Sequence, residues 1–412
     1  MSSETADPRP KHNVRKPAGT PSSQPAAPAA TEVIRRANDD DIPPLPSMAA
    51  LRYSVRDHLA WLRAQRTRWA FWKWRSGRLP RRADWPFDVV QIGRQDQRNW
   101  AEARWKLDAQ QDAGPSTAHE PRAWICDFPF PNSFCIPRLV STVVPLDRSV
   151  DEFFAAMDSE LRRRIRKQLP SCRIVRAVSD ADITFAEENM LRPYATARRG
   201  DGAVQLRIDE VRRIAEIGRL DVVYLNDEPV SCNLGSPIIR EGKKYWSALR
   251  YGFTEAVFSD RKRWGEINAL NNFVVLEWAL SHGFDCYDIG YAVSEPDDGL
   301  LQWKKRQGGA IGTMHNHDYD YVSLPRSHRP RIFWESPIFA IEQGKVTLHL
   351  GLPAEEPAES VLKRYRHMGF EGLGKVYLHC DRTPEDALLA GLQKLYGHLK
   401  TPPPIETTNC RP

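Results

Sequence analysis

Apolar residues recur along the chain at spacings that predict helices alternating with strands. Over residues 266–281 they recur about every 3.6 residues, which is typical of a helix with one buried face: Ile267, Leu270, Val274 and Trp278. Gly283 follows, and glycine commonly stands just past a helix C-terminus. Residues 284–289 then read as a strand and 294–299 as an acidic loop containing glycine. This stretch predicts a helix leading directly into a short strand.

The chain upstream shows the same kinds of pattern. Residues 149–152 form a capping-box pattern, and apolar residues at steps of four predict a helix that Pro170 ends. The patterns further predict a strand over 172–178, a helix over 209–217, a hairpin over 220–237 turning at Asn226-Asp227, and a strand over 245–253. Together these elements give a β-β-β-α-β order, so we expect a mixed α/β sheet within residues 140–325.

The two ends of the chain differ from this central part. Residues 1–47 are rich in Pro, Ala, Ser and charge, so we expect a disordered tail. Residues 48–139 form an N-terminal region rich in Trp and Arg, with a helix over 51–75 and strands over 85–90 and 124–128. Residues 326–412 form a C-terminal α/β extension, with strands over 345–351 and 375–380, helices over 358–368 and 383–397, and a loose end after residue 400.

The Trp-rich helix allows two interpretations. Its Trp side chains pack the helix onto the next unit while Arg covers the outside, or they form a basic-aromatic surface for RNA or a membrane face. We favour packing, because the basic residues between Trp61, Trp69, Trp72 and Trp74 form no single stripe.

Composition narrows the class of protein. The 412 residues are 41% hydrophobic and 27% charged, as in soluble globular proteins, and no run of eighteen apolar residues predicts a membrane span. The N-terminus has no apolar core typical of a secretory signal. Seven scattered cysteines without metal-ligand spacing indicate reduced thiols, so we expect a cytoplasmic protein. A net charge of +6 is too small by itself to indicate nucleic-acid binding.

Two short motifs carry a resemblance to a known family. The strand reads Tyr287-Asp288-Ile289-Gly290, and further on Trp303-Lys304 precedes Gly308. With the basic helix of residues 159–169 and the hairpin upstream, this order resembles the FemAB-like and BioF2-like branch of the Gcn5-related N-acyltransferases (GNAT). The resemblance spans roughly residues 140–320 and implies a GNAT-like acyltransferase fold, leaving open tandem units of that fold.

The resemblance also implies a function. The chain would be an acyltransferase that moves an acyl group from acyl-CoA, such as acetyl-CoA, to an amine of a small molecule, amino sugar or envelope precursor. Acyl-CoA would be a co-substrate and no cofactor would be tightly bound. Two alternatives stay open: transfer from aminoacyl-tRNA, as in FemAB-like enzymes, and a non-catalytic binding protein linked to polysaccharide synthesis.

Three residues are candidates for catalysis. Lys304 falls on the family's aromatic-Lys position and could stabilise an oxyanion or neutralise a phosphate, or it is a surface lysine in a basic run. Asp288 could deprotonate an attacking amine, or it is a buried carboxylate satisfied by backbone N–H groups. Tyr251 could supply a phenol donor, or simply end a strand. Trp303, Glu266 and Arg250 are candidates for substrate binding.

The loop before the 266–281 helix is the candidate donor site. In the family a helix start of the form R/Q-x-x-G-x-G/A holds the pyrophosphate of coenzyme A, because unpaired N–H groups there favour anions. Here the cations and one glycine are present but the exact motif is absent: Arg261, Lys262, Arg263 and Gly265. The basic run over 162–167 is a solvated face or a second docking surface for phosphates.

His315 and His317 have a spacing that puts both on one face of a strand, but no second ligand cluster accompanies them. A metal site is therefore not expected. Signature motifs of serine hydrolases, P-loop nucleotide hydrolases, zinc peptidases and dinucleotide-binding domains are absent from the sequence.

Overall fold

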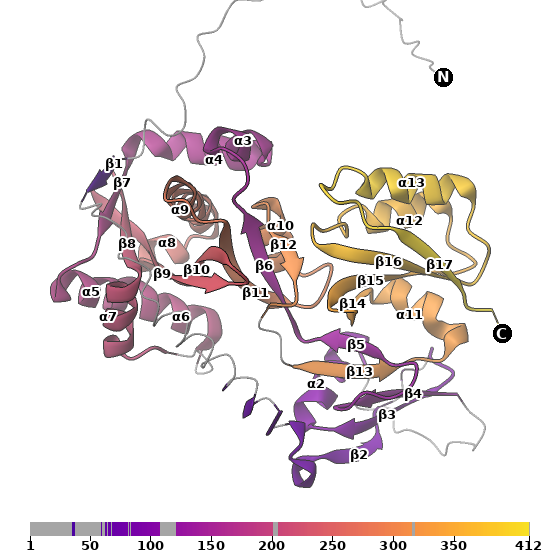
Figure 1. Ribbon diagram of the computed structural model, residues 1–412. Coiled ribbons are helices and arrows are strands. Elements are labelled where there is room, and N and C mark those ends of the chain that lie inside the picture. Colours follow the sequence, from indigo (N-terminus) through magenta and orange to yellow (C-terminus); the bar gives the residue numbers. More distant parts are fainter. Residues whose placement is uncertain are drawn as a thin grey trace, which may run out of the picture.

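The computed structural model describes residues 35–37, 59, 62–63, 65–66, 68–80, 82, 84–107, 121–200, 205–314 and 318–411. In this part of the chain the strands form three sheets, of eight, five and four strands (Figure 1). Parallel and antiparallel pairs occur in each, so the expected mixed α/β fold is confirmed. Most of residues 1–47 lie outside the described residues, and their expected disorder stays a prediction.

The eight-stranded sheet contains the predicted β-β-β-α-β order. Its strands run in the order β1-β7-β8-β9-β10-β11-β6-β12. Their bounds are β1 Arg35–Ala37, β6 Leu139–Pro145, β7 Cys172–Arg176, β8 Arg219–Leu225, β9 Glu228–Arg240, β10 Lys243–Phe253, β11 Cys286–Val293 and β12 Ala310–Gly312.

Helices cover both faces of this sheet (Figure 1). On one face α9 (Arg261–Ser281) packs its apolar side chains against strand residues such as Trp246 and Tyr287. Three further helices join it there: α3 (Val150–Ala156), α4 (Ser159–Gln168) and α8 (Glu255–Phe258). A second apolar cluster covers the other face. Its helices are α5 Asp180–Ala186, the π-helix η4 Glu187–Leu191, α6 Arg192–Arg199 and α7 Ile208–Ile217. The helix predicted over 266–281 is confirmed and begins five residues earlier.

The helix expected to run from residue 149 to Pro170 is two helices instead. Ser149 caps α3 (Val150–Ala156) with the predicted capping box. Met157 is then extended, and Asp158 starts α4 (Ser159–Gln168) by accepting hydrogen bonds from the backbone N–H groups of residues 160 and 161. Because a carboxylate at this position caps a new helix, it competes with continuation of the old one. A 3-10 turn, η3 (Leu169–Ser171), ends this region.

The five-stranded sheet is built by the N-terminal region and one later strand. Its order is β2-β3-β4-β13-β5, with α2 (Gln95–Trp105) packed beside β3. The strands are β2 Arg75–Arg78, β3 Asp88–Gly93, β4 Arg122–Cys126, β5 Phe134–Pro137 and β13 Tyr319–Ser323. In place of the C-terminal end of the expected 51–75 helix there is a 3-10 turn, η2 (Phe71–Lys73), leading into β2.

Packing of the Trp residues is confirmed for Trp74 and wrong for Trp72. Trp74 stacks on Phe128 with ring centroids 5.6 Å apart. Trp72, in contrast, is 77% exposed. Trp61 lies outside the described residues.

The four-stranded sheet forms the C-terminal region, in the order β14-β15-β16-β17. Its elements are η6 Arg326–His328, α11 Arg329–Glu335, β14 Ile338–Glu342, β15 Lys345–Leu352, α12 Ala358–Tyr365, β16 Leu373–Cys380, α13 Asp386–Tyr396 and β17 Ile405–Asn409. The expectation of a loose end after residue 400 is wrong, because β17 pairs in parallel with β16 over five residues. Thr407 and Thr408 give this edge strand too little apolar character to be seen in the sequence.

The sheets do not divide the chain in sequence order, and the expected domain bounds at residues 139 and 325 stay predictions. β5 and β6 are adjacent in sequence and lie in different sheets. β13, however, returns to pair with β4 and β5. The chain therefore leaves the eight-stranded sheet after Gly312, completes the N-terminal sheet, and only then builds the C-terminal one.

Candidate functional site

The eight-stranded sheet opens where β10 and β11 stop pairing. These parallel strands pair over three residues, from Tyr245 with Cys286 to Ser247 with Asp288, and then diverge. Both strands are irregular just past the last pair, β10 between Ala248 and Arg250 and β11 between Asp288 and Tyr291. Gly290 lies in the second irregularity at φ +77°, a conformation that favours glycine. We call this divergence the fork, together with the six side chains described next: Tyr251, Asn272, Tyr287, Asp288, Lys304 and Gln307.

A buried polar network lies at the fork, between the strands and α9. Asn272 Oδ1 accepts hydrogen bonds from Tyr287 at 3.0 Å and from Tyr251 at 3.2 Å, and the two phenol oxygens also contact each other. Asn272 Nδ2 donates to Gln307 Oε1 at 3.0 Å. Gln307 Nε2 is buried without a partner in the described residues. Such an orphaned donor in a buried network is unusual and can be satisfied by a ligand.

The phenols of this network keep their protons at neutral pH. Burial raises the pKa of Tyr251 above its ordinary value, and the nearby Asp288 charge acts in the same direction. Burial also raises the pKa of Tyr287, with Tyr251 adding to the effect. Both groups are therefore hydrogen-bond donors, suited to a developing negative charge and unsuited to act as bases.

Asp288, proposed from the sequence as a base, braces the fork. Its Oδ2 accepts from Ser247 Oγ at 3.0 Å, and its Oδ1 accepts from the backbone N–H of Gly290 at 2.8 Å. The residue is almost completely buried. Because both carboxylate oxygens are hydrogen-bonded within the fork, this geometry favours a positioning role for Asp288 over proton abstraction.

Lys304 is a buried lysine at the fork rather than a surface residue. It lies on α10 (Gly299–Arg306) and is only 4% exposed. Its Nζ donates to the carbonyl oxygen of Tyr291, on β11 past the last pair, at 2.6 Å. Burial lowers the pKa of Lys304 to about 8, against which the charge of Asp288 acts. The ammonium therefore dominates at neutral pH and is close to titrating.

A close backbone approach occurs at Gly309, just after α10. A Cβ added to Gly309 would lie 2.5 Å from Thr142 Cγ2 and 2.9 Å from the carbonyl oxygen of Lys304. Glycine thus lets the end of α10 pack closely on β6, which fixes the position of Gln307 and Lys304.

The three residues proposed for substrate binding lie in different surroundings. Trp303 is half-buried on α10, next to Lys304 in sequence. Arg250 is half-buried on β10. Burial raises the pKa of Glu187 of η4, and the charge of Arg250 acts against that rise. Glu266 is half-buried near the start of α9. The pKa of Arg163 is raised mainly by its hydrogen bond to Glu160, and the charge of Glu266 adds to this. Two of them are adjacent in sequence to a residue of the fork: Trp303 to Lys304, and Arg250 to Tyr251.

The N-terminus of α9 is capped by the chain's own carboxylate. Asp260 Oδ1 accepts from the backbone N–H groups of Lys262 at 2.8 Å and of Arg263 at 3.1 Å. These are the N–H groups that a pyrophosphate would otherwise use, so an internal anion occupies the expected place of an external one. Phosphate binding here would depend on side chains instead.

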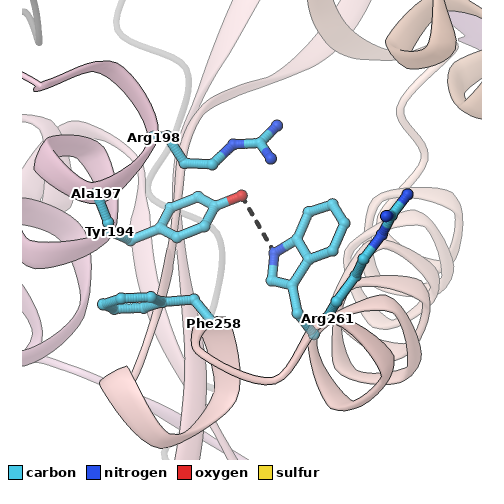
Figure 2. A pocket seen from close by; sticks show the side chains of 6 residues that line it. Tyr194, Ala197, Arg198, Phe258 and Arg261 are labelled. Atoms are coloured by element: carbon cyan, nitrogen blue, oxygen red, sulfur yellow. Dashed lines mark hydrogen bonds between the residues drawn. The ribbon is translucent and has the colours of Figure 1, made fainter.

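A cavity of about 340 Å³ lies beside this capped helix start (Figure 2). α6, α8 and α9 line it with aromatic rings and two arginines: Tyr194, Ala197, Arg198, Phe258, Arg261 and Trp264. Trp264 Nε1 donates to the Tyr194 hydroxyl at 3.1 Å. The guanidinium of Arg198 lies 5.2 Å from the Trp264 ring centroid. Neither Arg198 nor Arg261 forms an ion pair with a carboxylate in the described part of the chain, so two cations face this cavity.

The other cations proposed from the sequence are less available. Arg163 and Arg164 of α4 both bind Glu160. Arg164 also lies close to Gly265, where a Cβ on the glycine would be 3.6 Å from its Nη1. Arg263 lies 3.8 Å from Glu228. The basic run of α4 thus borders α9, partly neutralised by its own acidic residue.

The described residues match none of the patterns of metal sites, disulfides and membrane-spanning helices. They hold no group of three or more His, Cys, Asp or Glu side chains arranged for a metal ion, and His315 and His317 lie outside them. The seven cysteines form no disulfide there, and six are buried. Among the described helices, none has the length and apolarity needed to cross a bilayer.

Several site residues escaped the sequence patterns. Asn272 was missed because the apolar period identifies the buried face of a helix and passes over polar residues within it. Gln307 was missed because it follows α10, a helix that the sequence patterns did not predict. The available signal was three asparagines in one otherwise apolar helix, Asn268, Asn271 and Asn272, all of them buried. No local pattern brings Tyr194 and Arg198 to Trp264, because they meet only through tertiary packing.

No family model and no curated protein matches the sequence. Several solved structures are similar. FemX is 14% identical with a TM-score of 0.34, covering 65% of this chain and 96% of that one. L-PGS from Bacillus licheniformis is 12% identical with a TM-score of 0.33, covering 58% and 77%. A GCN5-related N-acetyltransferase from Kribbella flavida is 11% identical with a TM-score of 0.26, covering 66% and 94%.

The protein names that the sequence motifs suggested, Fem proteins and GCN5-related N-acetyltransferases, thus also occur among the similar structures. At such low identities and TM-scores, the similarity says nothing about activity.

Proposed function

We propose that the chain is an acyltransferase in which an amine attacks an activated acyl group held at the fork. The observation that carries this proposal is the interrupted β10–β11 ladder. Beyond Ser247 and Asp288 the facing edges of the two strands make no ladder hydrogen bonds to each other. Backbone groups of this kind need partners when buried, and an extended donor arm containing amides can provide them.

The side chains of the fork suit this chemistry. In acyl transfer the carbon–nitrogen bond forms, the bond to the leaving group breaks, and negative charge develops first on the carbonyl oxygen and then on the leaving group. Lys304 offers a buried cation, and Tyr251 offers a phenol that keeps its proton. Fixed donors in a water-poor site stabilise such charge without reorganising. The proton lost by the amine goes to solvent or to a second amine.

Acyl-CoA is the donor that we propose. Arg261 precedes Asn272 by eleven positions on α9, which corresponds to about 16 Å at 1.5 Å per residue. An extended pantetheine arm spans such a distance, so phosphates beside Arg198 and Arg261 would leave the thioester near the network. The donor would be a co-substrate without tight retention, and the acceptor a small amine, amino sugar or envelope precursor.

A second candidate is transfer from aminoacyl-tRNA. Asp260 favours it, because this carboxylate occupies the N–H groups that would otherwise bind a pyrophosphate. A tRNA acceptor end would instead use side-chain cations, and the run over 162–167 borders the same helix start. A non-catalytic binding protein is the third reading, and the experiment below separates all three.

The test is the thermal midpoint of the protein with coenzyme A, acetyl-CoA and a long-chain acyl-CoA. A donor at 100 times its Kd should stabilise the fold by about 2.7 kcal/mol. The Arg198→Ala/Arg261→Ala protein should lose most of that shift, whereas Arg366→Ala/Lys394→Ala, with the same charge change on exposed residues of the C-terminal region, should keep it.

Binding accompanied by thiol release on addition of amines supports the acyl-CoA proposal. If no coenzyme A compound shifts the midpoint but aminoacyl-tRNA is deacylated, the second candidate replaces it. Binding without turnover of any donor supports the non-catalytic reading.

A further inference from the structure

A basic-aromatic turn projects from the N-terminal sheet, well away from α9. It consists of five residues around η2 and the start of β2: Trp69, Phe71, Trp72, Lys73 and Arg75. Trp72 is 77% exposed, Phe71 57% and Trp69 46%. β2 lies at the lower edge of the view in Figure 1, whereas α9 lies in its upper half. Three large apolar side chains exposed within four residues are typical of an interaction surface, whereas single exposed apolar residues are ordinary.

Packing and hydrogen bonds on its buried side hold the turn in place, so the fold itself keeps the outer side chains exposed. Trp74 stacks on Phe128 and donates from Nε1 to the carbonyl oxygen of Arg68 at 2.8 Å. Arg68 in turn lies 5.8 Å from the ring centroids of Tyr319 and Tyr321 and donates to the Tyr319 carbonyl oxygen. One tryptophan thus fixes the turn while its neighbours remain outside.

Positive charge is concentrated around this turn. The sequence has eight Lys or Arg and no Asp or Glu between residues 58 and 83. The whole chain has a net charge of +6, so this segment carries +8 and the remainder −2. Arg78 and Arg82 bind carboxylates. Arg66, Lys73 and Arg75 are exposed and form no ion pair with a carboxylate in the described residues.

We propose that the basic-aromatic turn docks the protein on the surface of an anionic lipid bilayer. Trp and Phe side chains settle at the boundary between headgroups and acyl chains, and clustered Lys and Arg attract anionic headgroups. The protein would bind peripherally, with Phe71 and Trp72 inserted and Lys73 and Arg75 at the headgroups. This surface is distinct from the fork and does not depend on the proposed function.

Nucleic acid is a less suitable partner for this surface. Proteins that bind single strands hold the backbone in a basic groove and stack bases on aromatic rings within it. Here the rings occupy a protruding turn, where adjacent apolar side chains can enter a bilayer together.

The test is co-sedimentation of the full-length protein with two kinds of vesicle. One is phosphatidylcholine alone, and the other contains phosphatidylcholine and phosphatidylglycerol at 7:3. We expect the protein to bind the anionic vesicles at least about tenfold more tightly than the neutral ones. Phe71→Ala/Trp72→Ala should weaken binding to the anionic vesicles by about tenfold, because the two rings that would be buried in the bilayer are lost.

Charge variants separate this docking from general attraction. Arg66→Glu/Lys73→Glu/Arg75→Glu should abolish vesicle binding. Lys363→Glu/Arg366→Glu/Lys394→Glu makes the same change of charge on exposed residues of the C-terminal region and should leave binding intact. Equal loss in both triple variants, with each still folded by its thermal midpoint, overturns the proposal. So does a protein that binds single-stranded RNA through the turn but neither kind of vesicle.

Discussion

The fork and the C-terminal sheet both bury titratable side chains, but they do so in opposite ways. In the C-terminal sheet, His349 Nδ1 and His379 Nε2 lie 3.0 Å apart, and Thr347 Oγ1 lies 3.2 Å from His349 Nε2. The strands around them pair continuously, β15 with β16 from Val346 to Leu352 apart from one irregularity. At the fork, pairing stops after three residues.

The difference teaches how to recognise a site among buried polar groups. The two histidines lie on β15 and β16, which stay paired at both positions, and they contact each other. Burial and shifted pKa values there therefore describe a structural cluster. The fork combines an interrupted ladder, an orphaned amide on Gln307 and a lysine whose pKa lies near 8. Shifted pKa values occur in both regions, whereas the broken pairing and the orphaned amide occur together at the fork.

The sharpest way to break this comparison is to remove the Lys304 ammonium. Lys304→Met keeps the length and most of the volume of a side chain that is almost fully buried. If the cation stabilises developing charge, turnover of the donor should fall by about 100- to 1000-fold. The measurement is the rate of thiol release or deacylation together with the thermal midpoint.

Lys305 provides the matched control for that variant. It is the next residue on α10, and its Nζ donates to the carbonyl oxygen of His367 instead of facing the fork. Burial lowers its pKa to about 8 as well. Lys305→Met should therefore keep its activity. Equal rates in the Lys304→Met and wild-type proteins would leave the fork without its proposed cation.

The opposite outcome is expected in the C-terminal sheet. His379→Ala removes a buried ring and leaves His349 Nδ1 without its partner, which should lower the free energy of unfolding by about 2–4 kcal/mol. Activity of the folded fraction should be unchanged, because the pair does not face the fork. Urea unfolding measures the loss, and the exposed His398→Ala serves as control. A large loss of turnover with little loss of stability would instead place a functional site at the histidine pair of the C-terminal sheet.

Several elements of the eight-stranded sheet were predictable because they have local signals, whereas β1, β6 and β12 were not predicted. α9 shows an apolar period, Ser149 a capping box, and Asn226-Asp227 a turn, which has φ above zero at both positions. Nonlocal features were not predictable. β13 (Tyr319–Ser323) returns to pair with β4 (Arg122–Cys126), nearly 200 positions earlier in the chain, and the fork depends on where two strands cease to pair. Neither leaves a mark in a sequence window.

The site was predicted only in part for the same reason. Lys304, Asp288 and Tyr251 lie at or beside the fork. The apolar pattern does not pick out Asn272, which accepts from Tyr251, or Gln307, which accepts from Asn272. Asp288 shows that a sequence position does not fix a role, since hydrogen-bond partners decide whether a carboxylate can act as a base.

Acid should separate the two regions by a smaller effect. Burial lowers the pKa of His379 from 6.5 to about 3, with the charge of Arg329 adding to this, and lowers that of His349 well below 6.5. Below pH 6.5 the unfolded chain therefore binds more protons than the folded one, and stability falls as pH drops toward 3. His379→Gln should flatten this slope in thermal midpoints measured from pH 7 to pH 4. An unchanged slope would assign acid sensitivity to the carboxylates instead.

The smallest expected effect concerns the helix start that leads to the fork. Asp260→Asn keeps an oxygen that accepts from the N–H groups of Lys262 and Arg263 but removes a negative charge beside Arg261. Losing a carboxylate at a helix N-terminus should cost about 0.3–1 kcal/mol of stability. A phosphate-bearing donor should nevertheless bind a few-fold more tightly, since one repelling charge is gone, and added salt should reduce that gain. Calorimetric titration at two ionic strengths measures both. Weaker donor binding by the variant would mean that Asp260 holds the loop in its binding shape, and would move the phosphate site away from the arginines of the cavity.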